Sequence, residues 1–130
     1  MNKEQSMIWV TFTREGIHCY PDALTNLNLS DVKFLGHPHR HMFHFKVWIE
    51  VFHDDRDIEF ILFKRWLESL YIDNTLQLDY KSCEMIARDL HATIINRYPD
   101  RTVWIEVSED GENGCLLKFS NYHNNKEREN

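Results

Sequence analysis

Four of the chain's eight histidines fall between positions 37 and 44, and this cluster is where the sequence has the means to do chemistry. Imidazole nitrogen is the commonest metal ligand among protein side chains and suits zinc. Because side chains alternate across a β-strand, His39 and His41 share a face if a strand already begins at His39. Two imidazoles about 7 Å apart along a strand can both reach one ion where the strand twists locally. The pair therefore predicts a site for one divalent metal ion, zinc by preference.

A catalytic zinc site typically has three protein ligands and one open position, so a third ligand is needed. His18 is the candidate, because it lies just past the first expected strand, and a hairpin-like pairing would bring it beside His39. His37 and His44 are reserves, although His44 alternates to the face away from His41. The alternative interpretation is that these are solvated loop histidines, or histidines that contact an anionic ligand. Spacing alone leaves both interpretations open.

Alternating apolar and polar residues predict the elements that must position these side chains. The expected strands are 7–13, 42–53, 102–108 and 115–119, and the expected helices are 58–71 and 83–98. Asp57 and Ser82 are the expected helix caps. The segments 16–38, 72–81 and 109–114 are interpreted as a long connection, a polar connection and a turn. This order predicts an α+β domain: an antiparallel four-stranded sheet with two helices packed on one face.

The composition limits the classes of function. A length of 130 residues suits one domain, expected over 1–119, followed by a polar tail over 120–130 that we expect to fray. The net charge of -6 argues against nucleic acid, because binding phosphates needs a cationic surface. No apolar run approaches the roughly 20 residues of a membrane span, and no signal peptide is evident. Three cysteines without paired spacing indicate reduced thiols, so a cytoplasmic protein without a membrane partner is expected.

Several segments resemble motifs of one known family. His39-Arg40-His41-Met42-Phe43 resembles the His-Gly-His-aromatic segment of the 6-pyruvoyl-tetrahydropterin synthase and 6-carboxy-tetrahydropterin synthase family, whose members have the T-fold (tunnelling fold). Three further segments resemble family motifs in the same order: Ile58-Glu59-Phe60 with Lys64, the run Ser82–Ala87, and the hairpin around Glu109-Asp110. The resemblance covers roughly residues 9–119. It implies a T-fold subunit that assembles into a homo-oligomeric ring, with its pocket between neighbouring subunits.

The resemblance also implies roles for individual residues. It implies a zinc ion held by three ligands, namely His18, His39 and His41. It implies that Glu109 anchors the substrate, since a carboxylate accepts two hydrogen bonds from the guanidine-like edge of a pterin or purine ring. Two further substrate-binding candidates are Arg40, a cation beside the pair that suits a phosphate or carboxylate, and Glu84. Glu84 has a competing structural role at a helix N-terminus.

Two departures from the family concern its proton-transfer groups. Leu35 stands where the family has a cysteine, and Asp73-Asn74 is the nearest remnant of its Asp-His pair. Asn does not transfer protons as His does, which leaves Asp73 as the remaining candidate there. Cys19 and Cys83 are candidates to replace the thiol, since a thiolate near a metal has a lowered pKa. The alternative for both is the role of a small core residue.

Three functions follow as hypotheses. The first is a zinc-dependent lyase of the tetrahydropterin synthase type, acting on a pterin or purine-nucleotide-derived substrate. The second is a binding or sequestering module that keeps the pocket without the chemistry. The third is a structural oligomer in which the histidines are incidental. Turnover of a pterin substrate separates the first from the second, and metal content separates both from the third.

Overall fold

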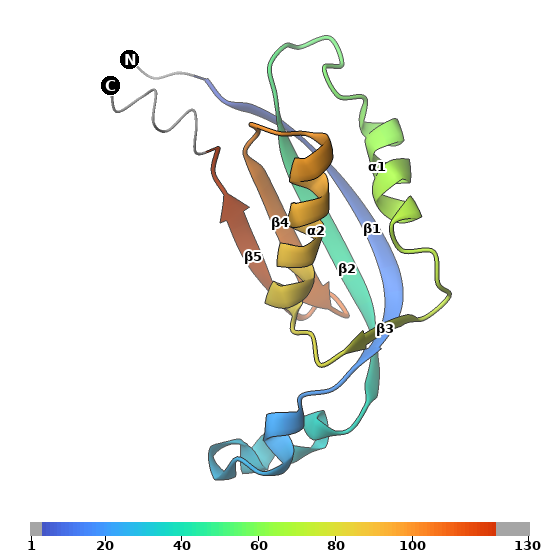
Figure 1. The fold of residues 1–130 in the computed structure, drawn as a ribbon, viewed down its shortest axis with the longest axis vertical. Helices are drawn as coiled ribbons and strands as arrows, with labels where there is room; N and C mark the ends of the chain where they lie inside the picture. The colour runs from blue at the N-terminus through green and yellow to red at the C-terminus, as the bar shows by residue number, and fades with distance from the viewer. Residues whose placement is uncertain (1–3, 122–130) are drawn as a thin grey trace.

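The computed structural model describes residues 4–121, which form an α+β architecture with two α-helices on one face of a five-stranded sheet (Figure 1). The strands are β1 (Ser6–His18), β2 (His39–Val51), β3 (Leu76–Asp79), β4 (Val103–Glu109) and β5 (Asn113–Phe119). The helices are α1 (Phe60–Ser69) and α2 (Cys83–Arg97), with two 3-10 helices, η1 (Pro21–Leu24) and η2 (Leu27–Gly36), between β1 and β2. The strand order in the sheet is β3-β1-β2-β4-β5.

The predicted four-stranded antiparallel sheet is wrong in one respect. Strands β1, β2, β4 and β5 are antiparallel neighbours, but β3 adds a fifth strand that runs parallel to β1, so the sheet is mixed. Strand β3 falls inside the segment interpreted as a polar connection. Its two buried leucines, Leu76 and Leu78, alternate with exposed Gln77 and Asp79 over only four residues. Such a short alternation within polar sequence gives too weak a periodic signal to predict a strand.

The two longest strands, β1 and β2, extend further at their site-bearing ends than the sequence indicated. Strands β1 and β2 pair continuously from Ser6 opposite Val51 to His18 opposite His39. The paired part of β1 includes Gly16, a residue type that had suggested the end of the strand. A Cβ at Gly16 would lie 2.7 Å from Leu78 Cδ1 and 2.9 Å from the Phe43 ring, so glycine is needed there for close packing.

The helix caps agree with the prediction at one of two positions. The Ser82 hydroxyl accepts a hydrogen bond from the Met85 N–H at 3.2 Å, as expected for the cap of α2. Helix α1 is instead capped by Glu59, while the predicted cap Asp57 forms a 2.9 Å ion pair with Arg101. The predicted starts of the two helices were therefore placed to within two residues.

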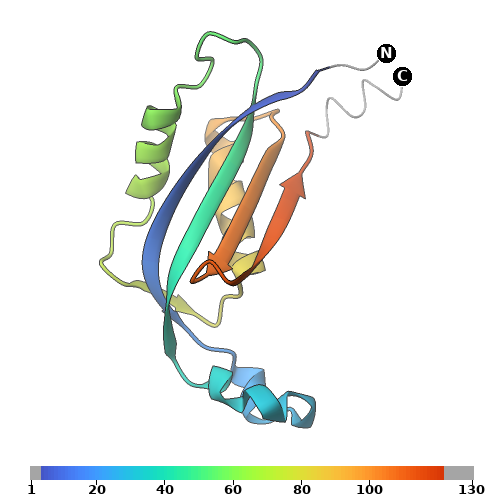
Figure 2. The same cartoon turned by 180° about the vertical axis from the view of Figure 1, so that it is seen from behind.

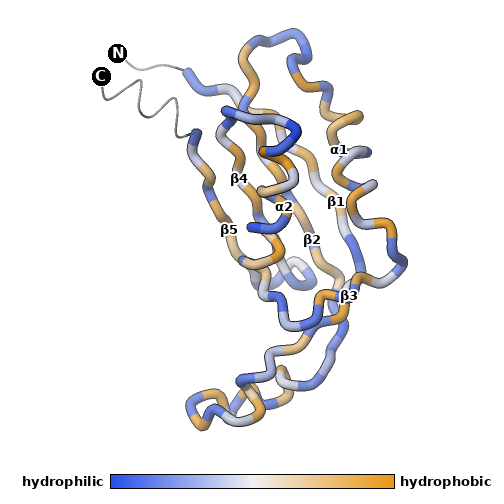
Figure 3. The backbone as a smooth tube through the Cα atoms, viewed as in Figure 1, coloured by the Kyte–Doolittle hydropathy of each residue, from blue (hydrophilic) through white to orange (hydrophobic). Residues whose placement is uncertain are grey.

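The sheet has one covered and one uncovered face. The core lies between the sheet and the helices, and its fully buried members include Phe45, Val47, Ile49 and Ile105. Within residues 4–121, no helix lies on the opposite face, as the reverse view shows (Figure 2). Hydrophobic and hydrophilic residues are interspersed along the strands and helices, whereas the top of the loop between β2 and α1 is hydrophilic (Figure 3). None of the helices within residues 4–121 combines the length and apolar character required to cross a bilayer.

The segment between β1 and β2 projects beyond the end of the sheet (Figure 1). We call this segment, residues 19–38, the arm; it contains η1 and η2. The Tyr20 N–H donates to the Leu35 oxygen and closes the base of the arm. Leu27 and Phe34 on the arm are 87% and 65% exposed, which is unusual for large apolar side chains. The base of the arm lies next to the ends of β1 and β2, where the histidines are.

Candidate metal centre

His18, His39 and His41 form one cluster at the open end of the covered face. His18 ends β1 and pairs directly with His39 at the start of β2, so the predicted pairing is confirmed. The ring centroids are 4.6 Å apart for His18 and His39, 4.9 Å for His39 and His41, and 5.4 Å for His18 and His41. One ring nitrogen of each histidine lies within 4.8 Å of those of the other two. This spacing suits three ligands of one ion.

In each of the three rings, Nδ1 lies within hydrogen-bonding distance of an oxygen atom. The Nδ1···O distances are 2.8 Å for His18, 2.8 Å for His39 and 2.7 Å for His41, and the acceptors are the main-chain oxygens of Lys81 and His37 and the carboxylate of Asp110. Because these oxygens only accept, each neutral ring is assigned the tautomer in which Nδ1 donates. Nε2 is then the atom with the free lone pair. Metal-ligating histidines characteristically have their other nitrogen engaged in this way.

Two of the three Nε2 atoms are buried without a hydrogen bond. Among residues 4–121, Nε2 of His18 and Nε2 of His41 find no partner of acceptable geometry. The Glu109 carboxylate lies 3.2 Å and 3.3 Å from them, close enough for electrostatic attraction to protonated rings but outside hydrogen-bonding geometry. A buried polar atom without a partner costs about 1–3 kcal/mol. The residues therefore fit a divalent cation, which would satisfy both nitrogens.

A cavity of about 550 Å³ opens beside the cluster. Its wall combines the sheet, the base of the arm and the start of α2, with His18, His39, Glu109, Cys19, Tyr20, Leu35, Tyr80, Lys81, Ser82, Cys83, Glu84, Met85, Asn113 and Gly114 as lining residues. This volume lies within the range of small-molecule sites. A heterocycle of two fused rings therefore has room next to the histidines.

Glu109 lies in a different element from the one predicted. It was expected to open a turn but is the last residue of β4, opposite Phe43. Its side chain therefore faces the covered side of the sheet together with His41, and the prediction of a turn at this position is wrong. The predicted alternation is confirmed for Glu106, which is exposed on the opposite face. Glu84 also lines the cavity from α2.

The structure does not bring Arg40 or Asp73 to the cluster. Arg40 lies between two histidines in β2, so its side chain points to the opposite face, where it forms a 2.6 Å ion pair with Glu15. Asp73 is exposed in the loop between α1 and β3 and does not line the cavity. Neither residue lines the cavity beside the histidines.

The two candidate thiols differ in their surroundings. Cys83 is buried, and this burial, followed by the negative charge of Glu109, raises the pKa of its thiol to about 12. Cys19 is half-buried in the cavity wall, and its N–H donates to the Asp79 oxygen at 2.8 Å. Cys83 is therefore protonated at neutral pH and is a poor nucleophile or base, whereas Cys19 remains the thiol available to a ligand.

Cys83 is expected to resist alkylation. With a pKa of about 12, roughly one Cys83 thiol in ten thousand is ionised at pH 8, and only the thiolate reacts. Iodoacetamide at pH 8 should leave Cys83 unmodified for hours in the folded protein and modify it within minutes after unfolding in urea. Peptide mass spectrometry measures both. Modification of folded Cys83 at the rate of the unfolded residue would contradict its described environment.

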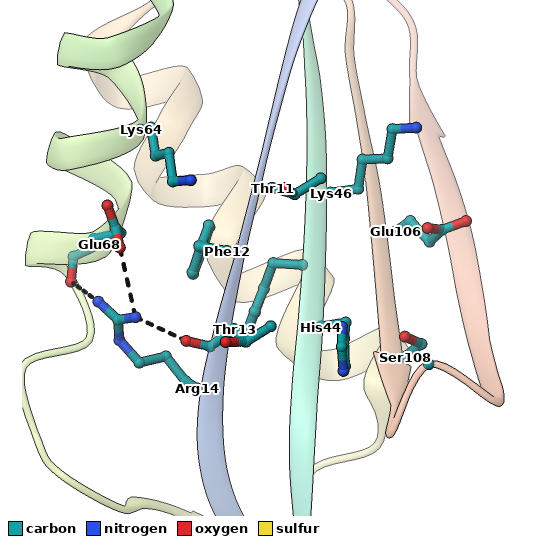
Figure 4. Close-up of a pocket in the computed structure, with 12 residues that line it drawn as sticks. Thr11, Phe12, Thr13, Arg14, His44, Lys46, Lys64, Glu68, Glu106 and Ser108 are labelled. Atoms are coloured by element: carbon teal, nitrogen blue, oxygen red, sulfur yellow. Dashed lines mark hydrogen bonds and ion pairs between the residues drawn. The ribbon is translucent and has the colours of Figure 1, made fainter.

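A second cavity, of about 520 Å³, wraps around the edge of β1 (Figure 4). Lys64 and Glu68 of α1 form one wall, and His44 and Ser108 lie on the uncovered side of the sheet. Arg14 within it is tied to Glu68 by an ion pair of 3.7 Å and by a hydrogen bond to the Glu68 oxygen. The His18–His39–His41 group is the only candidate metal cluster found among residues 4–121, so the chemistry is assigned to the first cavity.

Two groups that orient the histidines were missed at the sequence level. The main-chain oxygen of Lys81 carries no sequence signal, because any residue offers it. Asp110 does carry one: it is an acidic residue directly after Glu109, in the turn that faces the start of β2. A carboxylate near a histidine pair is a common orienting partner of metal ligands.

No protein-family model matches the chain, and no curated protein matches it either. The family resemblance of the motifs therefore stays a prediction. The structure itself shows an α+β domain with a mixed sheet and a three-histidine cluster beside a cavity.

Proposed function

We propose that the chain holds one zinc ion through His18, His39 and His41, and binds a pterin- or purine-like heterocycle beside it, as a divergent protein of the tetrahydropterin synthase type. The observation that carries the proposal is the state of the three rings: each Nδ1 meets an oxygen, and two of the Nε2 atoms are buried without a hydrogen bond. Zinc bound there would act as a Lewis acid toward a substrate oxygen or a water molecule.

Glu109 is proposed to anchor the heterocycle. Its carboxylate lines the cavity, is partly exposed to it, and has no hydrogen-bond donor of acceptable geometry from His18 or His41. Two carboxylate oxygens match the two N–H groups on the guanidine-like edge of a pterin or guanine ring. The heterocycle would then lie between Glu109 and the start of α2.

Glu109→Gln should weaken pterin binding by about 10- to 100-fold, because hydrogen bonds to a charged group contribute about 1.5–3 kcal/mol. Zinc stoichiometry should stay at that of the unsubstituted protein. Calorimetric titration of the zinc-loaded protein with neopterin measures the first, and elemental analysis the second. Glu106→Gln is the matched control, since it removes a carboxylate from the opposite face of β4. Loss of zinc in Glu109→Gln, with pterin affinity retained, would instead make Glu109 a metal ligand.

A second candidate function is a binding or sequestering module without turnover. Leu35, which stands at the family's cysteine position, lines the cavity but has no proton to transfer; Cys83 lines it but keeps its proton at neutral pH, and Asp73 is not among the lining residues. Cys19 is the remaining thiol. Incubation of zinc-loaded protein with dihydroneopterin triphosphate separates the two functions: conversion that is lost in Cys19→Ser supports an enzyme. Tight binding with unchanged ligand supports the module.

The proposal includes a homo-oligomeric ring in the cytoplasm. Strand β3 pairs with β1 only over Gly16–His18, so the outer edge of β1 before it has no strand partner among residues 4–121. The outer edge of β5 is likewise open within that part of the chain. Exposed strand edges and the apolar tips of the arm favour contacts with further copies. Light scattering should give several subunits per particle, and a monomer would contradict the ring.

A further inference from the structure

We infer that Asp110 is a positioning residue of the zinc site: its carboxylate fixes the His41 ring with Nε2 toward the metal and strengthens that ring as a ligand. This inference rests on the proposed metal site and extends it by one residue. It concerns how firmly the chain holds the ion, rather than which ligand the cavity takes.

Asp110 is joined to residues 41 and 42 of β2 by three short contacts. Its Oδ2 lies 2.7 Å from Nδ1 of His41, and its Oδ1 accepts the Met42 N–H at 2.9 Å. Its own N–H donates to the Met42 oxygen at 2.7 Å. Both carboxylate oxygens are thus engaged, which removes the rotational freedom of the side chain. The turn after β4 is thereby clamped to the strand that carries two of the three ligands.

The His41 ring differs from the other two in the charge of its partner. His18 and His39 meet neutral main-chain oxygens, whereas His41 meets a carboxylate. A carboxylate partner fixes the tautomer and raises the basicity of the coordinating nitrogen, and loss of such a partner typically costs 10- to 100-fold in metal affinity.

The backbone at this position permits a clean substitution. Asp110 has φ 57° and Gly111 has φ 70°, both in the left-handed region. Asn adopts this region at least as readily as Asp, so Asp110→Asn keeps the turn and the size of the side chain while it removes the charge. Gly111→Ala does the reverse, because it strains the turn and leaves the carboxylate in place.

The test compares zinc dissociation constants at pH 7, measured by competition with a chelating dye, for the unsubstituted protein, Asp110→Asn, Glu112→Gln and Gly111→Ala. Glu112→Gln is the charge-matched control, because Glu112 is an exposed carboxylate in the same turn. We expect Asp110→Asn to weaken zinc binding by 10- to 100-fold, and Glu112→Gln to change it by less than twofold. Equal constants for Asp110→Asn and Glu112→Gln would overturn the inference, as would an equal loss in Gly111→Ala, which would assign the effect to the turn.

A second readout does not depend on metal. Nitrogen NMR of the metal-free protein reports the tautomer of His41, which should carry its proton on Nδ1 in the unsubstituted protein and lose this preference in Asp110→Asn. An unchanged His41 tautomer in Asp110→Asn would overturn the inference that Asp110 fixes the orientation of this ring. If the unsubstituted protein binds no zinc, the metal site and this inference fall together. If it binds zinc through three histidines and Asp110→Asn binds as tightly, only the role of Asp110 falls.

Discussion

Replacing both His39 and His41 by alanine is expected to weaken zinc binding by on the order of 10³-fold or more and to leave the fold intact. Two of three ligands are lost, and ligand bonds supply most of the binding free energy at such sites. Both side chains are only half-buried at the open end of the sheet, so the core keeps its packing. Elemental analysis after dialysis against a weak chelator measures the metal, and circular dichroism checks the fold.

The matched control for this double variant is His44→Ala. His44 belongs to the same strand and the same histidine run, but its side chain lies on the uncovered face, opposite Ser108. Its removal should leave the zinc content unchanged. If the double variant retains as much zinc as His44→Ala, the metal does not bind at this cluster, and the site is wrong.

Phe43→Ala is expected to lower the free energy of unfolding by about 3–5 kcal/mol, the usual cost of truncating a buried phenylalanine. Phe43 is fully buried, and its ring lies edge-on to two ligand rings, with centroids 5.2 Å from His18 and 5.9 Å from His41. Gly16 provides the space in which it packs. The substitution should therefore also weaken zinc binding, because two ligands lose the surface that holds their rings.

Urea unfolding in the presence of a chelator measures this change without a contribution from bound metal. Phe60→Ala is the control, because Phe60 is 55% exposed at the start of α1 and its truncation should cost less than about 1 kcal/mol. A loss for Phe43→Ala as small as that for Phe60→Ala would mean that Phe43 does not support the site as described.

The long strands and the histidine pairing were predictable because side chains in a strand repeat every two residues. That period places His39, His41 and Phe43 on one face whatever the exact length of the strand, and pairing of neighbouring strands then brings His18 alongside. Strand β3 was not predictable in the same way. Two buried leucines in a polar segment become a strand only because β1 offers an open edge beside them.

The surroundings of the histidines depended on tertiary contacts that local sequence does not contain. Four of the six residues 109–114 are common turn formers, so nothing local indicated that β4 continues to Glu109. Its pairing with Phe43 and Asn113 decides the end of the strand. The carbonyl that orients His18 comes from Lys81, 63 positions away along the chain. The position of Arg40 was predictable, since alternation alone places it opposite its two neighbours.

X-ray absorption at the zinc edge of the zinc-loaded chain tests the central claim most directly. Three imidazole ligands predict zinc–nitrogen distances of about 2.0–2.1 Å, with the multiple-scattering pattern of histidine and no sulfur in the coordination sphere. A zinc–sulfur distance of about 2.3 Å would instead place a thiol of the cavity wall, Cys19 or Cys83, among the ligands and would contradict the three-histidine site.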